Sequence, residues 1–196
     1  MRRSASIAIL AAAATLFSTA AFAHPGLPGH THGFIDGFVH PLSGLDHLLA
    51  MVAVGLWAAQ LGGRALWLMP LTFVATMTVG AALGFGGVAM PWIEIGIAAS
   101  VLVLGAMVAL KLRPSLALSL PLVAGFAALH GYSHGVELPA DASGLSYGIG
   151  FIVATLALHM VGIGLGLAAG RVPVRYVART AGAAIACVGL LLVVTH

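Results

Sequence analysis

Residues 40–61 read HPLSGLDHLLAMVAVGLWAAQL and place two histidines and an aspartate at the head of a long apolar run. Ionisable side chains are costly inside a bilayer unless they are paired, hydrated or bound to a ligand. The rest of the chain is equally apolar, because 61% of its 196 residues are hydrophobic and only 7% are charged. A water-soluble domain carries about 25% charged residues. The sequence therefore predicts an all-α, polytopic membrane protein.

Hydrophobic runs of about 20 residues, the length of a membrane helix, recur six times after residue 37. Segments rich in glycine, proline and charge separate them. The predicted spans cover residues 38–61, 65–88, 92–111, 115–136, 144–170 and 174–195, and make up one transmembrane domain, 38–196. In the fifth, Gly162, Gly166 and Gly170 recur at a four-residue spacing that is typical of closely packed membrane helices.

Residues 1–23 have the pattern of a secretory signal peptide. Two arginines precede the apolar stretch SIAILAAAATLF, and the segment ends in an Ala-x-Ala pattern. Cleavage there would make His24 the mature N-terminus, on the outer side of the cytoplasmic membrane. The alternative interpretation is an uncleaved seventh helix.

The positive charges indicate the orientation of the six spans. If the mature N-terminus is outside, every Lys and Arg after residue 23 falls in an inner loop, as the positive-inside rule requires. These residues are Arg64, Lys111, Arg113, Arg171, Arg175 and Arg179. We therefore predict a multi-pass protein of the bacterial inner membrane with both termini outside. The formal net charge of +3 reflects scarce acidic residues, so no nucleic-acid partner is expected.

Ionisable residues within the predicted spans are few, and they cluster in the first, fourth and fifth. They are His40, Asp46 and His47, then His130, His134 and Glu137, and finally His159. On a helix of 3.6 residues per turn, the three from the fourth span form one stripe. Histidines four residues apart can share a metal ion, as they do in the helical HExxH zinc motif.

Depth in the membrane suggests which of these side chains can meet. The first span enters from outside and the fourth exits there, so His47 and His130 both lie in the outer half. A regular helix would separate His40 from His47 by about 10 Å, although Gly44 could relax that segment. His159 lies deeper, where it is either a way station for an ion or an interhelical hydrogen-bonding group.

Imidazole and carboxylate without thiolate suit a borderline divalent metal such as nickel, cobalt, zinc or iron. A second group of candidate ligands lies in residues 24–37, a histidine-rich segment predicted to be periplasmic. It contains His24, His30, His32 and Asp36. These side chains could capture metal at the membrane entrance, or they are incidental to a flexible Gly/Pro linker.

The motifs HPLSGLDHLLAM and HGYSHGVE, with a signal peptide ending just before a histidine, resemble those of the HupE/UreJ family. Its members are associated with hydrogenase and urease gene clusters and are regarded as nickel permeases, with cobalt-linked members. The resemblance covers the whole chain. It implies metal recognition by six residues: His40, Asp46, His47, His130, His134 and Glu137. It also implies nickel(II) or cobalt(II) as the transported ion, no permanent cofactor and a link to hydrogenase or urease maturation.

Together these features predict a secondary transporter that takes up a divalent metal ion, and not an enzyme. No nucleotide-binding motif is present, so the chain itself is not expected to hydrolyse ATP. Three alternatives stay open. One is a membrane metal-binding or sensor protein without transport. Another is an intramembrane hydrolase that uses Ser133 in GYSHG. The third is a haem protein with paired histidine ligands.

Overall fold

Apolar helices make up the computed structural model, which describes residues 33–138, 143–169 and 175–195. No strand occurs in these ranges, so the all-α prediction is confirmed for them. The predicted signal peptide, residues 1–23, and the following residues 24–32 lie outside the described part. The helices are α2 (Phe34–Ser43), α3 (Leu45–Leu61), α4 (Ala65–Phe85), α5 (Ile93–Ala109), α6 (Leu116–Glu137), α7 (Ser143–Ala169) and α8 (Arg175–Thr195).

Four of these helices, α4, α6, α7 and α8, are long and apolar enough to cross a membrane. α2 and α3 meet the same criterion only as a pair, and α5 is apolar but has 17 residues. By length and composition the described residues therefore hold four candidate spans, or five if the α2–α3 pair counts as one. These helices support the prediction of a membrane protein. Six spans would require that the α2–α3 pair forms one span and that α5 also crosses the membrane.

The predicted first span, 38–61, is not one continuous helix, and the break falls at Gly44, where the sequence was expected to allow the helix to relax. α2 and α3 meet at Gly44 and bend by 83°. Gly44 has an extended backbone (φ −86°, ψ 116°), and its N–H donates to the His40 carbonyl at 3.3 Å. Glycine is a poor helix former, and Pro41 lies in the turn just before it, so the sequence favours a break at this point. The bend turns His40 back toward the start of α3.

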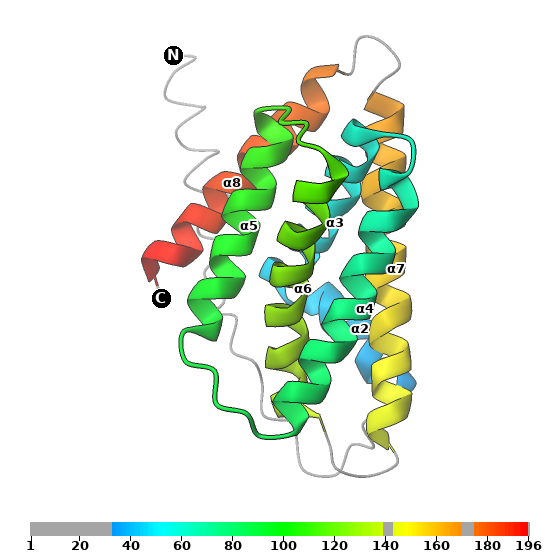
Figure 1. The fold of residues 1–196 in the computed structure, drawn as a ribbon, viewed down its shortest axis with the longest axis vertical. Coiled ribbons are helices and arrows are strands. Elements are labelled where there is room, and N and C mark those ends of the chain that lie inside the picture. The colour runs from blue at the N-terminus through cyan, green and yellow to red at the C-terminus, as the bar shows by residue number, and fades with distance from the viewer. Residues whose placement is uncertain (1–32, 139–142, 170–174, 196) are drawn as a thin grey trace, which may run out of the picture. The chain divides into compact units, whose positions relative to one another are not determined.

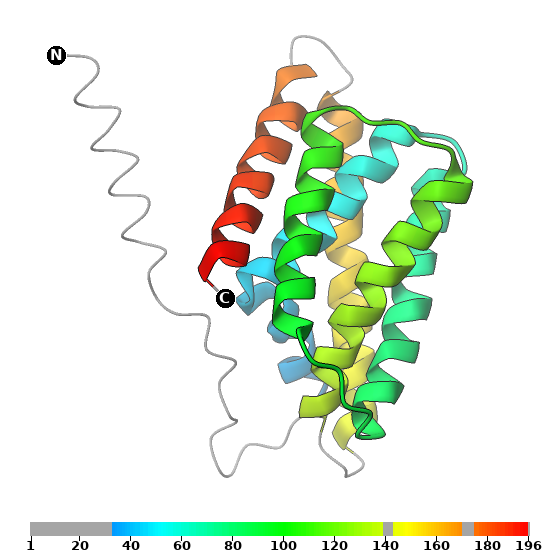
Figure 2. The same cartoon turned by 60° about the vertical axis from the view of Figure 1, so that its left-hand side comes forward.

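Three helix pairs, α4 with α6, α5 with α8, and α3 with α7, form the main packing contacts (Figures 1 and 2). In the α3–α7 pair, a Cβ added at Gly162 would overlap the carbonyl oxygen of Val52. A Cβ at Gly55 would overlap the carbonyl oxygen of His159, so both backbones need a residue without a side chain here. The predicted packing role is confirmed for Gly162 and for Gly166, which lies against Ala59, while Gly170 is outside the described residues.

Side-chain hydrogen bonds connect the helices at one end. Trp57 Nε1 donates to the Leu112 carbonyl at 3.0 Å, and Gln60 Nε2 donates to the Val108 carbonyl at 3.0 Å. Arg179 Nε donates to the Ala109 carbonyl at 3.1 Å. Figure 2 shows the α3–α4 turn, the α5–α6 connection and the beginning of α8 at this same end. Four positive residues therefore gather there: Arg64, Lys111, Arg113 and Arg179.

Candidate functional site

Four buried or half-buried histidines meet where α2, α3 and α6 come together. The ring centroid of His134 lies 4.8 Å from that of His40 and 4.4 Å from that of His47. His47 and His130 are 5.0 Å apart, and His40 and His47 are 6.4 Å apart. We call these four residues the histidine cluster. The structure thus brings His40 next to His47, which a regular helix could not do, and confirms that the first and fourth predicted spans meet.

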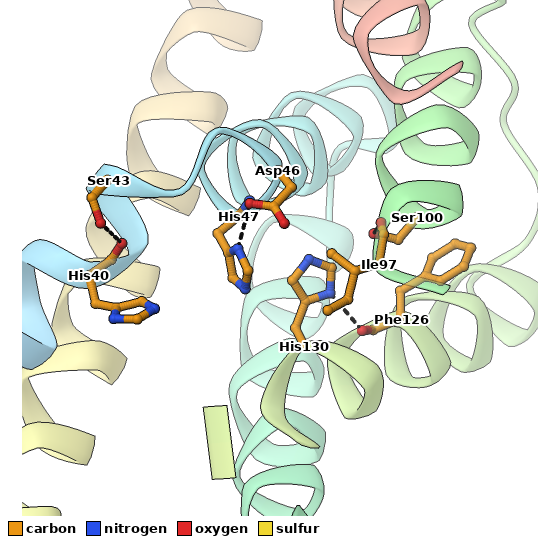
Figure 3. A network of polar contacts seen from close by, with 8 residues as sticks. All are labelled: His40, Ser43, Asp46, His47, Ile97, Ser100, Phe126 and His130. Carbon is orange, nitrogen blue, oxygen red and sulfur yellow. Dashed lines mark hydrogen bonds and ion pairs between the residues drawn. The ribbon is translucent and has the colours of Figure 1, made fainter. Parts of the chain in front are cut away.

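Hydrogen bonds orient two rings of the cluster. His47 Nδ1 lies 2.7 Å from Asp46 Oδ1, and since a carboxylate only accepts, Nδ1 carries the proton (Figure 3). His130 Nδ1 likewise donates to the Phe126 carbonyl, at 2.9 Å. In a neutral imidazole the other nitrogen then carries a lone pair. The Nε2 atoms of both rings are buried and have no hydrogen-bond partner, so each is oriented as a metal ligand would be.

His134 is a buried member of the histidine cluster with no hydrogen bond to orient its ring. Its ring packs 4.3 Å from that of Phe151, and neither of its nitrogens has a hydrogen-bond partner. A buried polar atom left unpaired costs about 1–3 kcal/mol, so such a group calls for an occupant that bonds to it. A cavity of about 410 Å³ between α4, α6 and α7 reaches His134 and is otherwise lined mainly by apolar side chains, among them Met77, Tyr147 and Phe151.

The histidine cluster is arranged in ring pairs. Across residues 33–138, 143–169 and 175–195, no three His, Cys, Asp or Glu side chains converge on a point where one metal ion could be held. The contacts between neighbouring rings are instead edge-to-face, with interplanar angles of 81° for His47 and His130 and 87° for His40 and His134. An ion that bound here would meet two imidazoles at a time, or it would require a ring to turn.

His159 lies apart from the histidine cluster, on α7, and is fully buried. Its ring is 4.9 Å from that of Phe73, which in turn lies 5.9 Å from the ring of His130. Neither nitrogen of His159 has a hydrogen-bond partner. The alternative in which this histidine is satisfied by an interhelical hydrogen bond therefore gains no support. Phe73 thus contacts both His159 and His130 of the cluster, and sequence reasoning missed it because a phenylalanine in an apolar span carries no signal of its own.

Among the remaining predicted site residues, only Asp36 has a side chain within the described part of the chain. Glu137 is the last residue of α6, and its side chain is outside the described part. Asp36 is exposed in the first turn of α2, where its Oδ2 accepts a hydrogen bond from the Gly33 N–H at 3.4 Å. His24, His30 and His32 lie outside the described residues. The role of the outer segment in metal capture therefore stays a prediction.

Ser133, the nucleophile of the hydrolase alternative, lies between two histidines of α6. Such a mechanism requires a hydrogen bond between the serine hydroxyl and a histidine ring that acts as its base. His130 Nδ1 bonds to the Phe126 carbonyl instead, while its Nε2 and both nitrogens of His134 are unpartnered. The geometry of the described residues therefore gives this alternative no support.

The fold and the site define a class of protein, namely a helical membrane protein with imidazoles buried among its helices. The chain belongs to the HupE/UreJ family, whose model, described as HupE / UreJ protein, matches residues 12–192. It is similar to Protein HupE of Rhizobium leguminosarum bv. viciae, with 43% identity over 182 residues that cover 93% of this chain and 94% of that protein. The family resemblance predicted from the sequence is thereby confirmed. No solved structure matches the chain.

Proposed function

We propose that this protein is a secondary transporter that takes up a divalent transition-metal ion across the bacterial cytoplasmic membrane, with nickel as the first candidate and cobalt as the second. The observation that carries the proposal is the histidine cluster. It gathers imidazoles from three helices in an apolar interior. The Nε2 atoms of His47 and His130 and both ring nitrogens of His134 have no hydrogen-bond partner. Buried polar groups without partners are costly in a membrane and mark ion pathways.

The chemistry of the cluster suits an ion that must bind and then leave. Imidazole is a good ligand for nickel and related divalent metals. A structural site closes around its metal with four protein ligands, whereas paired rings leave positions for water. Asp46 is proposed to hold His47 in its ligand orientation and to offset part of the ion's charge. His40, His47, His130 and His134 would replace part of the hydration shell, with Glu137 at the outer end of α6.

The membrane potential can drive the ion inward. Two positive charges that cross 100 mV, negative inside, gain about 4.6 kcal/mol. Such a transporter needs no nucleotide. His159 would act as a second station between the cluster and the cytoplasm, since its unpartnered nitrogens are buried further along the helices. The delivered ion would supply the maturation of a hydrogenase or a urease.

The proposal includes a topology of six spans after a cleaved signal peptide, residues 1–23. The α2–α3 pair would form one broken span and α5 a short one, which gives residues 38–196 as the transmembrane domain. Residues 24–37 would lie outside, where His24, His30, His32 and Asp36 collect metal. Support comes from the end of the helices where Arg64, Lys111, Arg113 and Arg179 gather, because positive residues favour the cytoplasmic side.

Uptake of radiolabelled nickel into proteoliposomes with an inside-negative potential tests the proposal. Wild-type protein should accumulate the ion, and His47→Ala should reduce the initial rate at least about tenfold because this ring contacts three other histidines. Leu49→Ala is the matched control, since it truncates a half-buried side chain of α3 that carries no ligand atom. It should transport at the wild-type rate.

Equilibrium binding of nickel to the purified protein in detergent separates transport from simple binding. Wild-type protein that binds nickel but does not move it into liposomes would identify a metal-binding or sensor protein and refute transport. Equal uptake by wild type and His47→Ala would refute the site assignment.

A further inference from the structure

We propose that Phe73 is the barrier between the histidine cluster and His159, and that its ring sets both the rate and the ion selectivity of transport. This inference rests on the proposed function and deepens it. The sequence alone does not suggest this role, because Phe73 is one of many apolar side chains in the predicted span 65–88. The argument rests on its ring contacts with two buried imidazoles, His130 and His159.

Phe73 extends from α4 to the space between α6 and α7. Its ring is tilted by 55° against that of His130 at 5.9 Å, and it contacts His159 edge-to-face, at 74° and 4.9 Å. All three side chains are fully buried. His130 Nε2 and both nitrogens of His159 have no hydrogen-bond partner. The phenyl ring therefore contacts two imidazoles that carry unpartnered nitrogens and belong to two different helices.

The residues one turn away on α4 give this position a soft, apolar lining. Met69 and Met77, four residues to either side of Phe73, are buried as well. The Thr155 hydroxyl of α7 donates to the Met77 sulfur at 4.0 Å, which places the two helices face to face here. Thr155 and His159 are four residues apart and so share a face of α7. α4 thus presents two thioethers and a phenyl ring along the route from the cluster to His159.

A phenyl ring cannot replace a ligand of a divalent ion. Its face attracts cations only weakly, and it has no lone pair to offer in place of water or imidazole. An ion that leaves His130 for His159 must therefore wait until the ring moves, and water is excluded in the meantime. Removal of the ring would leave a space bounded by polar nitrogens, and a space of this kind can hold water. The two stations would then be joined by a hydrated passage.

The experiment compares Phe73→Ala and Phe73→Leu in proteoliposomes, with nickel influx, magnesium influx and nickel binding in detergent as readouts. We expect nickel influx down its gradient to rise about tenfold in Phe73→Ala, which corresponds to a barrier lower by about 1.4 kcal/mol. Phe73→Leu, which keeps an apolar side chain and removes only the ring, should give a smaller rise and covers the case in which the alanine variant does not fold. Magnesium, which wild-type protein should exclude, should enter through Phe73→Ala, while nickel binding at the cluster stays at the wild-type level.

Trp67→Leu is the matched control. This aromatic side chain also belongs to α4, but it is exposed and contacts none of the described site residues named above. This variant should match wild type in all three readouts. Wild-type rates and selectivity in both Phe73 variants, with binding intact, would overturn the barrier and leave the proposed function standing. Slower influx with intact binding would also overturn it. Wild-type protein that neither binds nor transports nickel would refute the proposed function itself.

Discussion

Asp46 holds the ring of the next residue, His47, in place. Asp46 Oδ1 accepts one hydrogen bond from His47 Nδ1 at 2.7 Å and another from the His47 backbone N–H at 2.8 Å. These two hydrogen bonds position the imidazole at the beginning of α3. Its Nε2 atom is buried and has no hydrogen-bond partner. A carboxylate–histidine pair of this kind fixes the tautomer of a metal ligand and raises its basicity.

Asp46→Asn should weaken nickel binding about 10- to 100-fold while the protein still folds. The amide has nearly the same shape, but it removes the negative charge and no longer dictates which nitrogen of His47 carries the proton. Isothermal titration of the purified variant in detergent measures the change, and thermal unfolding checks its stability. Unchanged affinity in a variant of normal stability would show that Asp46 does not orient the ligand.

His159→Ala should separate binding from transport. The residue makes no ring contact with the histidine cluster in the described structure, whereas Phe73 contacts both His159 and His130. We therefore expect nickel affinity at the cluster to stay within about twofold of wild type, while influx falls at least about tenfold because the second station is lost. Nickel binding in detergent measures the affinity, and nickel uptake into proteoliposomes measures the influx. A large loss of affinity would instead place His159 in the same site as the cluster.

Gly162→Ala should destabilise the protein by about 1–3 kcal/mol, the usual cost of forcing an extra group into a packed contact. Its new Cβ would overlap the Val52 carbonyl and push α7 away from α3, the helix that carries His47 of the histidine cluster. Gly164→Ala is the matched control on the same helix, because an added Cβ there meets nothing within 4 Å. Thermal unfolding in detergent compares the two. Equal stability of both variants would mean that α3 and α7 do not need this close approach.

Single cysteines at the two ends of α5 test the proposed orientation and the crossing of this short helix. In a Cys187→Ala background, Val88→Cys precedes α5 and Ser115→Cys follows it, and both positions are exposed. A membrane-impermeant maleimide should label Val88→Cys in intact cells and Ser115→Cys only after permeabilisation, because the positive charges lie at the Ser115 end. The reverse pattern would invert the topology, and labelling of both from outside would show that α5 does not cross.

Much of the architecture could be predicted from local sequence. Apolar runs predicted helices that the structure contains, and the glycines of the fifth predicted span indicated its close packing on a neighbour. Two predicted spans differ in detail from the helices of the structure. Gly44 divides the segment 38–61 into α2 and α3, and the segment 92–111 contains a helix of 17 residues. Hydrophobicity alone does not distinguish a continuous apolar helix from a bent one, since both bury the same kinds of side chain.

The candidate site, like the fold, could be predicted from the sequence only in part. The sequence by itself determined the residue types, an apolar chain with imidazoles and carboxylates on a few helices, and the depth that allows His47 to meet His130. Only the tertiary structure decided that His40 joins them, because the bend at Gly44 sets the direction of α2. It also decided that Phe73 contacts both His130 and His159. Helical periodicity determines which residues share a face, but contacts between helices distant in sequence depend on how their faces pack.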